Sequence, residues 1–131
     1  MREVSCLFAT RWDKVLLATK DGGKNWHFPQ EEVRRDVKGN PIETPLDAIY
    51  RIVDKLDGIE EEDVIPETSR EYRSHRGEHT LYHVFMTDSK LDHGELRSNG
   101  TTYEWTSNPH SKNLNECTRL KLMEYTFFPE T

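Results

Sequence analysis

Carboxylates gather in one stretch of this chain, in a polar loop and in the segment that follows it. Glu31, Glu32 and Glu43 belong to the loop, and Asp54 and Asp57 come after it. Carboxylate oxygens are the ligands that Mg²⁺ and Mn²⁺ prefer, and a bound cation of this kind can make a nucleophile from water. Metal-assisted hydrolysis is therefore one chemistry that these residues suggest. A solvated acidic loop is the simpler interpretation, and we favour it.

The segment after the loop has the features of a helix over residues 45–56 or 45–57. Thr44 is a residue type that caps helix N-termini, and Pro45 suits the first helical position because the N–H that it lacks would have no partner there. Apolar residues at positions 46, 49, 53 and 56 recur at helical spacing. Gly58 stands where a left-handed residue commonly ends a helix.

Two short stretches are distinctive: residues 26–30 read Trp-His-Phe-Pro-Gln, and residues 43–51 read Glu-Thr-Pro-Leu-Asp-Ala-Ile-Tyr-Arg. Both resemble the Nudix hydrolase family, most of all its RNA pyrophosphohydrolase and dinucleoside polyphosphate hydrolase branch. The family box reads G-x5-E-x7-R-E-U-x-E-E-x-G-U, where U is a bulky aliphatic residue. Its E, R, U, G and U are matched here by Glu43, Arg51, Val53, Gly58 and Ile59. The resemblance implies an α/β fold, an α/β/α sandwich with a mixed β-sheet, as a single domain over residues 1–131.

The same box lacks the residues that hold metal in the family. There, the glutamate after the box arginine and the Glu-Glu pair further on coordinate a divalent cation and help to activate water. The residues at these positions are Ile52, Lys55 and Leu56, so none is a carboxylate and one is a cation. Because hard cations bind poorly beside an ammonium group, we expect a degenerate box and no cofactor. We also expect Ile52 and Leu56 to extend the apolar packing of the helix.

The acidic loop keeps a hydrolase open as an alternative. Glu43 and Arg51 match the family, whereas the glycine pair that the family has after the Gln of the first stretch is replaced by Glu31 and Glu32. The resemblance implies that this loop packs beside the helix, where Glu31, Glu32 and Glu43 could converge as substitute metal ligands. Mg²⁺ or Mn²⁺ would be needed only in that case.

Basic residues are candidates for meeting the charge of a bound phosphate. Lys55 stands at a metal-ligating position of the family, and its ammonium group could replace part of a cation's charge. Arg70 and Arg73, on a predicted strand, could add bidentate contacts through their planar guanidinium groups. Lys20 and Arg76 could extend the same basic rim. A solvent-facing strand explains the arginines equally well.

Aromatic and histidine side chains are the remaining candidates. Trp105 could stack on a nucleobase, and so could Tyr103, although we expect core packing for at least one of them. His79 and His83 project from the same face of a predicted strand, but no third metal ligand has fitting spacing. Structural or surface roles are therefore favoured for both histidines.

The composition indicates one compact, highly charged domain. The 131 residues are 32% charged and 34% hydrophobic, and their net charge is −6. Such an acidic chain is not expected to coat nucleic acid broadly, and no apolar run approaches a membrane span. Cys6 and Cys117 lie in apolar stretches, which favours buried thiols over a disulfide. With a beginning unlike a signal peptide, the sequence leads us to expect a cytoplasmic protein.

The other elements follow from alternation, turn residues and periodicity. Strands are predicted over residues 4–10, 15–19, 26–29, 64–73, 79–86 and 101–105, with turns at 11–14 and 75–78. Residues 34–41 have the composition of an exposed insertion, and residues 60–63 that of an acidic linker. Residues 114–125 suggest a second helix.

Three functions remain open. The favoured one is a non-catalytic Nudix-like domain that binds a nucleotide, a capped or triphosphate RNA 5′ end, or a partner protein in the family's cleft. The second is a divergent pyrophosphohydrolase of nucleoside-diphosphate-linked compounds that uses carboxylates of the loop. The third is a protein-interaction or inhibitor module whose acidic surface is the working face. The ligand class is implied by the resemblance alone.

Overall fold

One mixed β-sheet organises the part of the chain that the structure describes. This computed structural model describes residues 2–73, 79–91, 95–98 and 100–124, with the backbone alone for residues 70, 72, 73 and 95–98. The strands are β1 (Arg2–Arg11), β2 (Lys14–Thr19), β3 (Gln30–Glu32), β4 (Ile65–Arg73), β5 (His79–Asp88), β6 (Glu95–Ser98) and β7 (Thr101–Thr106). Their order is β4-β5-β1-β2-β7-β6, with β3 beside β1. β1 and β5 run parallel and the other neighbours antiparallel.

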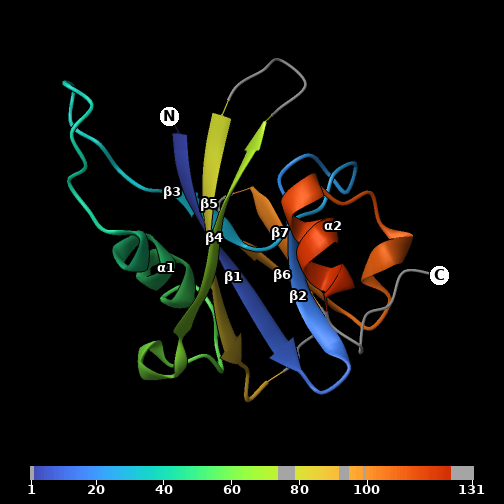
Figure 1. The fold of residues 1–131 in the computed structure, drawn as a ribbon. Helices are drawn as coiled ribbons and strands as arrows, with labels where there is room; N and C mark the ends of the chain where they lie inside the picture. Colours follow the sequence, from blue (N-terminus) through green and yellow to red (C-terminus); the bar gives the residue numbers. More distant parts are fainter. Residues whose placement is uncertain (1, 74–78, 92–94, 99, 125–131) are drawn as a thin grey trace.

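Two helices cover opposite faces of this sheet, α1 (Pro45–Val53) and α2 (Glu116–Met123), as Figure 1 shows. Because strand side chains alternate between faces, β1 serves both layers. Its Val4, Cys6 and Phe8 pack in the cluster that includes α2, and its Leu7 and Ala9 pack in the cluster that includes α1. The predicted α/β/α sandwich with a mixed sheet is confirmed. Neither of these helices has the length and apolar content needed to cross a membrane.

α1 begins as predicted and ends earlier. Thr44 caps its N-terminus through a reciprocal capping box, with Pro45 at the first helical position. The N–H groups of Lys55 and Leu56 then donate to carbonyls three residues back, so the chain tightens into a turn instead of continuing the helix. Gly58, with a φ of 86°, completes that turn. The predicted end at residue 56 or 57 is therefore wrong, and Lys55 and Leu56 lie beyond the helix.

The apolar side of α1 and of the turn after it is buried, which confirms that part of the prediction. Ile52 is 1% exposed and sits in the cluster between α1 and the sheet. Leu56 is half-buried and packs against the same cluster. Full burial of an aliphatic side chain contributes about 1.5–3 kcal/mol. Ile52 is thus a core residue of this chain.

The third strand lies further along the chain than predicted. Trp26 and His27 make only isolated bridges. Pro29 has no N–H to donate to a strand ladder, and its carbonyl accepts from the N–H of Leu7 at 2.9 Å. Regular pairing with β1 starts at Gln30. The strand predicted over residues 26–29 is corrected to β3 for this reason.

Several smaller elements differ from the prediction, either because they were not predicted or because they are shorter than predicted. β6 was not predicted, nor were the 3₁₀ turns η1 (Glu61–Asp63), inside the acidic linker, and η2 (Pro109–Ser111). α2 is shorter than the predicted range 114–125, because Asn115 caps its N-terminus. The segment over residues 34–42 is an exposed loop that protrudes from the body of the protein (Figure 1). The predicted turn at 75–78 lies outside the described residues.

Both cysteines are buried free thiols, as the sequence predicts. Cys6 of β1 and Cys117 of α2 belong to the same apolar cluster. A hydrogen bond with Cys117, together with burial, raises the pKa of Cys6 well above its usual value. Cys6 is therefore a protonated thiol, and both cysteines pack as core residues between the sheet and α2.

Candidate functional site

A cleft opens where β2, β3 and β7 face the turn after α1. Its cavity measures about 380 Å³, within the range of about 300–1,000 Å³ that is usual for small-molecule sites. β7 supplies Tyr103, the turn after α1 supplies Lys55, and the segment from β2 to β3 supplies most of the rest. The polar and aromatic side chains of its wall are Lys20, His27, Gln30, Glu31, Lys55, Thr101 and Tyr103.

A second cavity of about 290 Å³ adjoins the first. The two share the walls formed by Lys20, Gln30 and Glu31. The second cavity adds three arginines and one carboxylate from β1, the 31–34 segment and α1. These residues are Arg2, Glu32, Arg34 and Arg51. We call the two adjoining cavities together the cleft; among the charged residues of its walls, cations outnumber carboxylates.

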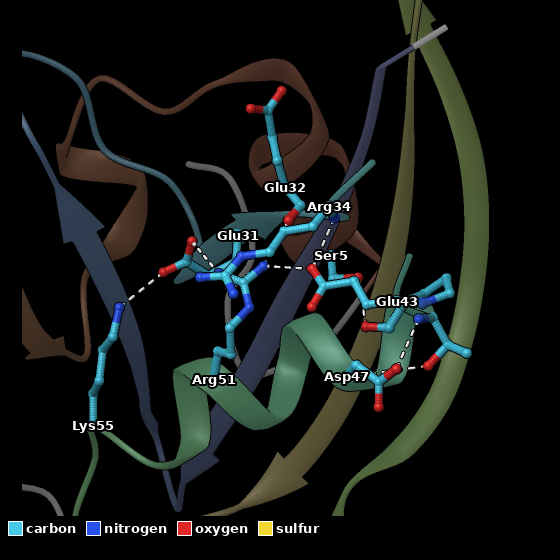
Figure 2. A network of polar contacts seen from close by, with 10 residues as sticks. Ser5, Glu31, Glu32, Arg34, Glu43, Asp47, Arg51 and Lys55 are labelled. Atoms are coloured by element: carbon cyan, nitrogen blue, oxygen red, sulfur yellow. Dashed lines mark hydrogen bonds and ion pairs between the residues drawn. The ribbon is translucent and has the colours of Figure 1, made fainter. Parts of the chain in front are cut away.

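Arg51 lies at the centre of the polar network beside this cleft (Figure 2). Its Nη1 donates to Glu31 Oε2 at 3.2 Å, and its Nη2 donates to Glu43 Oε1 at 2.6 Å. Nη2 also donates to the backbone carbonyl of Glu32 at 2.7 Å. Glu43 Oε1 accepts a further bond from the N–H of Arg34 at 2.8 Å. Arg51 therefore holds β3 and the start of the protruding loop against α1.

Glu31 is held between two cations. Lys55 Nζ donates to its Oε1 at 2.9 Å from the side opposite Arg51, as Figure 2 shows. Burial acts to raise the pKa of Glu31, but the hydrogen bond with Lys55 and the charges of Lys55 and Arg51 outweigh it and lower the pKa. Glu43 behaves alike, since the bonds from Arg51 and Arg34 outweigh the effect of burial and lower its pKa. Both carboxylates are therefore ionised and internally neutralised.

The three loop carboxylates do not form one cluster. Glu31 and Glu43 meet at Arg51, whereas the side chain of Glu32 pairs with Arg2. The box positions lie apart in the same way, because Ile52 is buried in the core while Lys55 reaches Glu31. Within the residues that the structure describes, no group of three or more His, Cys, Asp or Glu side chains is arranged to hold a metal ion.

Among the predicted ligand-binding residues, Lys55 lines the cleft and Trp105 packs against the core beside α1. Arg70 and Arg73 are in β4, at the sheet edge beyond β5, and their side chains lie outside the described residues, as does Arg76. Tyr103 is 6% exposed, which agrees with the core packing expected of at least one of the two aromatic residues, and it also lines the cavity; its stacking on a base stays a prediction.

His79 and His83 bind protein side chains. His79 Nδ1 pairs with Glu71, and His83 contacts Ser69 Oγ at 2.9 Å and Glu3 Oε1 at 3.1 Å. These separate partners fit the structural roles that the sequence favours.

His27 and Gln30 are cleft residues that sequence reasoning missed. His27 Nδ1 donates to the carbonyl of Phe28 at 2.7 Å, so its other ring nitrogen can act as an acceptor. Burial, assisted by the charge of Lys20, lowers the pKa of His27, so the ring is neutral at pH 7. Gln30 carries a buried Oε1 without a hydrogen-bond partner within the described residues. Both residues belong to the Trp-His-Phe-Pro-Gln stretch, so the sequence signal for them is the same stretch that carries the family resemblance.

Comparison with known proteins gives a clear architectural result. No family model matches the sequence, and no curated protein matches it. Among solved structures, a NUDIX hydrolase from Nitrosomonas europaea superposes with a TM-score of 0.67 at 14% identity, covering 95% of this chain and 87% of that one. A MutT NUDIX hydrolase from Burkholderia pseudomallei gives 0.64 at 16% identity, covering 95% and 98%. The chain has the Nudix fold.

A third similar structure is a pyrophosphohydrolase from Bacillus subtilis, with a TM-score of 0.56 at 14% identity over 97% of this chain and 70% of that one. At such low identities the likeness establishes the Nudix fold alone. The chemistry of the site has to be inferred from the side chains of this chain. The Glu43–Arg51 ion pair keeps two box positions together in this Nudix fold. Of the neighbouring box positions, Ile52 lies in the core and Lys55 pairs with Glu31.

Proposed function

We propose that this Nudix-fold chain binds a nucleotide or an RNA 5′ end in the cleft beside α1, without hydrolysing it by the metal-assisted Nudix mechanism. One observation carries the proposal. Lys55 stands where the family resemblance implies a metal-ligating glutamate, and its ammonium group is 2.9 Å from Glu31. A fixed positive charge thus lies where the resemblance places a divalent cation.

The charge balance of the cleft supports a phosphate ligand. Among the described residues that line the two cavities, five are cationic, namely Lys20, Lys55, Arg2, Arg34 and Arg51, and two are acidic, namely Glu31 and Glu32. The whole chain has the opposite sign, with a net charge of −6. Cationic walls concentrate anionic ligands and bind phosphate oxygens directly. The likeness to a pyrophosphohydrolase agrees with a phosphate-bearing ligand.

The ion pairs of the cleft argue against a bound divalent cation. A cation at Glu31 would have to displace both Lys55 and Arg51, which neutralise that carboxylate. Glu43 is likewise engaged by Arg51. Because Mg²⁺ binds weakly beside fixed positive charge, metal activation of water is disfavoured here.

A binding titration in EDTA tests this proposal. Wild-type protein should bind ATP or a 5′-triphosphate RNA oligonucleotide in EDTA, and the affinity should fall as salt rises, because the contacts are ionic. Lys55→Glu reverses the charge at the centre of the cleft, so it should weaken binding by at least about tenfold. Fluorescence anisotropy with a labelled RNA and competition by ATP would measure both effects.

Lys38→Glu is the matched control, because Lys38 is exposed in the protruding loop, away from the cleft walls. It makes the same change in net charge and should leave the affinity within about twofold of wild type. The proposal fails if wild type binds none of these ligands in EDTA at low salt, or if Lys55→Glu binds as tightly as Lys38→Glu.

A divergent hydrolase is the second candidate, and two observations favour it. Glu31 and Glu43 are brought to one place by Arg51, and His27, whose ring is neutral at pH 7, lines the cavity. Displacement of both Lys55 and Arg51 from Glu31 on substrate binding would free a carboxylate for Mg²⁺ or Mn²⁺. Turnover assays with these metals separate this candidate from the binding proposal.

A protein partner is the third candidate. The protruding loop carries two exposed apolar side chains, Val37 and Ile42. Retained nucleotide binding after Val37→Ser and Ile42→Ser would show that any such contact is separate from the cleft.

A further inference from the structure

We infer that a groove between α1 and the sheet edge at β4 docks a basic segment of a partner protein, which inserts large apolar side chains flanked by lysine or arginine. The groove measures about 460 Å³ and lies between the start of α1, residues 64–69 and β5. It shares no lining residue with the cleft. The inference therefore concerns a second surface and does not depend on the proposed function.

Apolar side chains form much of the wall of this groove. Leu46 of α1 and Val64 before β4 are half-buried, and Pro66 of β4 is exposed. Phe85 of β5, which is 6% exposed, completes the apolar wall. Because burial of apolar surface is the main source of favourable free energy in association, the groove favours an occupant with large apolar side chains.

Hydrogen bonds at its walls hold the groove in shape. Ser5 Oγ of β1 donates to the carbonyl of Pro45 at 2.8 Å, which ties the start of α1 to the sheet. Ser69 Oγ and His83 Nδ1 are 2.9 Å apart and join β4 to β5, and His83 Nε2 lies 3.1 Å from Glu3 Oε1. These polar groups are thus engaged with one another. A preformed site of this kind needs little ordering on binding.

Carboxylates accompany both the α1 wall and the β4 wall of the groove. Residues 60–63 read Glu-Glu-Glu-Asp and lead directly into the β4 wall. The carboxylate of Asp47 accepts from the N–H of Thr44, a wall residue, at 2.8 Å. Neither residues 44–50 nor residues 60–69 include a lysine or an arginine. The groove therefore presents apolar surface beside negative charge, which complements a segment that carries lysine or arginine.

Within the described residues, no ion pair neutralises the carboxylates of residues 60–63. The cations Arg51 and Lys55, at the end of α1 and in the turn after it, bond a carboxylate of β3 instead. Desolvation, a hydrogen bond with Asp54 and nearby like charges raise the pKa of Glu61. A basic partner would relieve this crowding of carboxylates.

A second copy of this chain fits the groove less well than a basic partner does. Two acidic surfaces of this kind repel each other. β4 is at the edge of the sheet, but Pro66 lacks the N–H that strand pairing needs, and a bulge interrupts the strand between Pro66 and Thr68. Both features protect an edge strand against pairing with another strand. The occupant is therefore held by its side chains.

An NMR titration of ¹⁵N-labelled wild-type protein with three synthetic peptides tests the inference. The first peptide is Lys-Arg-Leu-Phe-Arg-Lys. The second, Lys-Arg-Ser-Ser-Arg-Lys, lacks the apolar side chains, and the third, Glu-Glu-Leu-Phe-Glu-Glu, has the opposite charge. The first should bind at least about tenfold tighter than either of the others, because it alone combines apolar burial with charge complementarity. Its amide shift changes should centre on residues 44–46, 64–69 and 83–85.

Pro66→Lys tests the groove at a wall residue, and Ile65→Lys is the matched control. Both side chains are exposed, and Ile65 is not among the described residues that line the groove. Pro66→Lys places a cation in the wall and removes apolar surface, so affinity for the first peptide should fall at least about tenfold. Ile65→Lys makes the same change in net charge and should stay within about threefold of wild type. Dispersed amide spectra of both variants would show that the fold is kept.

Four results would overturn the inference and leave the proposed function of the cleft untouched. Equal binding of the first two peptides to wild type would mean that charge alone attracts them. Shift changes that centre outside the groove, or none at about 1 mM of the first peptide, would exclude this surface. Equal losses of affinity in Pro66→Lys and Ile65→Lys would mean that the wall makes no specific contact. A dimer in analytical ultracentrifugation whose formation shifts the same amides would assign the groove to a second copy.

Discussion

At the scale of single residues, the site depends on Arg51 and the carboxylates around it. Arg51 bonds Glu31, Glu43 and the backbone of Glu32, so one guanidinium group joins α1, β3 and the protruding loop. Its planar fork holds these donors in a fixed geometry, whereas a lysine ammonium is a compact point charge on a flexible stem. Lys55 then completes the neutralisation of Glu31.

His27 should make the protein less stable in mild acid. Its pKa is lowered from 6.5, first by burial and then by the charge of Lys20, against the opposing hydrogen bond to Phe28. As the pH falls through 6.5, the unfolded chain gains a proton on this ring before the folded chain does. The free energy of unfolding therefore decreases, until the folded ring is protonated too.

Urea unfolding at pH 7.5 and pH 5.5 measures this effect. The contribution of His27 at pH 5.5 is at most about 1.4 kcal/mol, since that pH lies one unit below the unfolded pKa. His27→Gln removes the titrating ring, so its stability should decrease less between the two pH values than that of wild type. An identical decrease in both proteins would assign the acid sensitivity to other groups.

At the scale of elements, the early end of α1 creates the site. If the helix had continued to residue 56, as predicted, Lys55 would be a helical side chain. The turn after Val53 instead carries Lys55 to Glu31 of β3. The same turn keeps Leu56 against the core. The turn therefore places Lys55 beside Glu31 of β3 and Leu56 against the apolar core.

The elements that the sequence predicts well are those set by local pattern. β1 and β2 alternate between two buried layers, β7 places Tyr103 and Trp105 in the layer on the α1 side, and α1 starts with a capping box that is visible in the sequence. The end of α1 and the place of β3 were predicted wrongly because distant contacts decide them. Leu91 packs on Gly58, and the carbonyl of Pro29 is bonded by Leu7.

Gly58→Ala should destabilise the protein more than Gly39→Ala does. Both glycines have a left-handed backbone, with φ values of 86° and 85°, so alanine costs about 1–2 kcal/mol at either position. A Cβ on Gly58 would also lie 2.9 Å from the backbone N of Leu91, whereas a Cβ on Gly39 would meet nothing within 4 Å.

Thermal or urea unfolding of the two variants isolates that contact with Leu91. We expect Gly39→Ala to lose about 1 kcal/mol and Gly58→Ala at least about 2 kcal/mol of the free energy of unfolding. Equal losses of the free energy of unfolding would mean that the Leu91 segment moves away from the new Cβ without destabilising the protein. The turn after α1 would then be less firmly fixed than its packing indicates.

At the scale of the whole molecule, the Nudix fold could be predicted from the sequence, whereas the residues of its cleft could be predicted only in part. The sandwich was predicted because two short stretches of the sequence resemble the Nudix family, and that resemblance implies the fold. The cleft was predicted in part: Lys20, Lys55 and Glu31 were candidates, and Gln30 and His27 were not. Their place in the wall depends on which side chains face a cavity, and this cannot be read from residue spacing.

The charge distribution of the whole molecule favours ligand entry at one place. Its net charge of −6 repels polyanions in general, whereas the walls of the cleft carry more cations than carboxylates. A small phosphate compound or a single RNA end can enter without bringing a long phosphate backbone against the acidic surface. This distribution suits a terminal or mononucleotide ligand better than the middle of a nucleic-acid chain.

A turnover assay tests most directly whether the cleft binds without metal-assisted hydrolysis. Wild-type protein would be incubated with diadenosine polyphosphates, NADH, nucleoside triphosphates and 5′-triphosphate RNA, each with Mg²⁺ and with Mn²⁺. We predict no release of phosphate or nucleotide above background, because Ile52, Lys55 and Leu56 supply no carboxylate to the cation. Metal-dependent release that disappears in the double variant Glu31→Gln/Glu32→Gln would contradict this prediction and establish a divergent hydrolase.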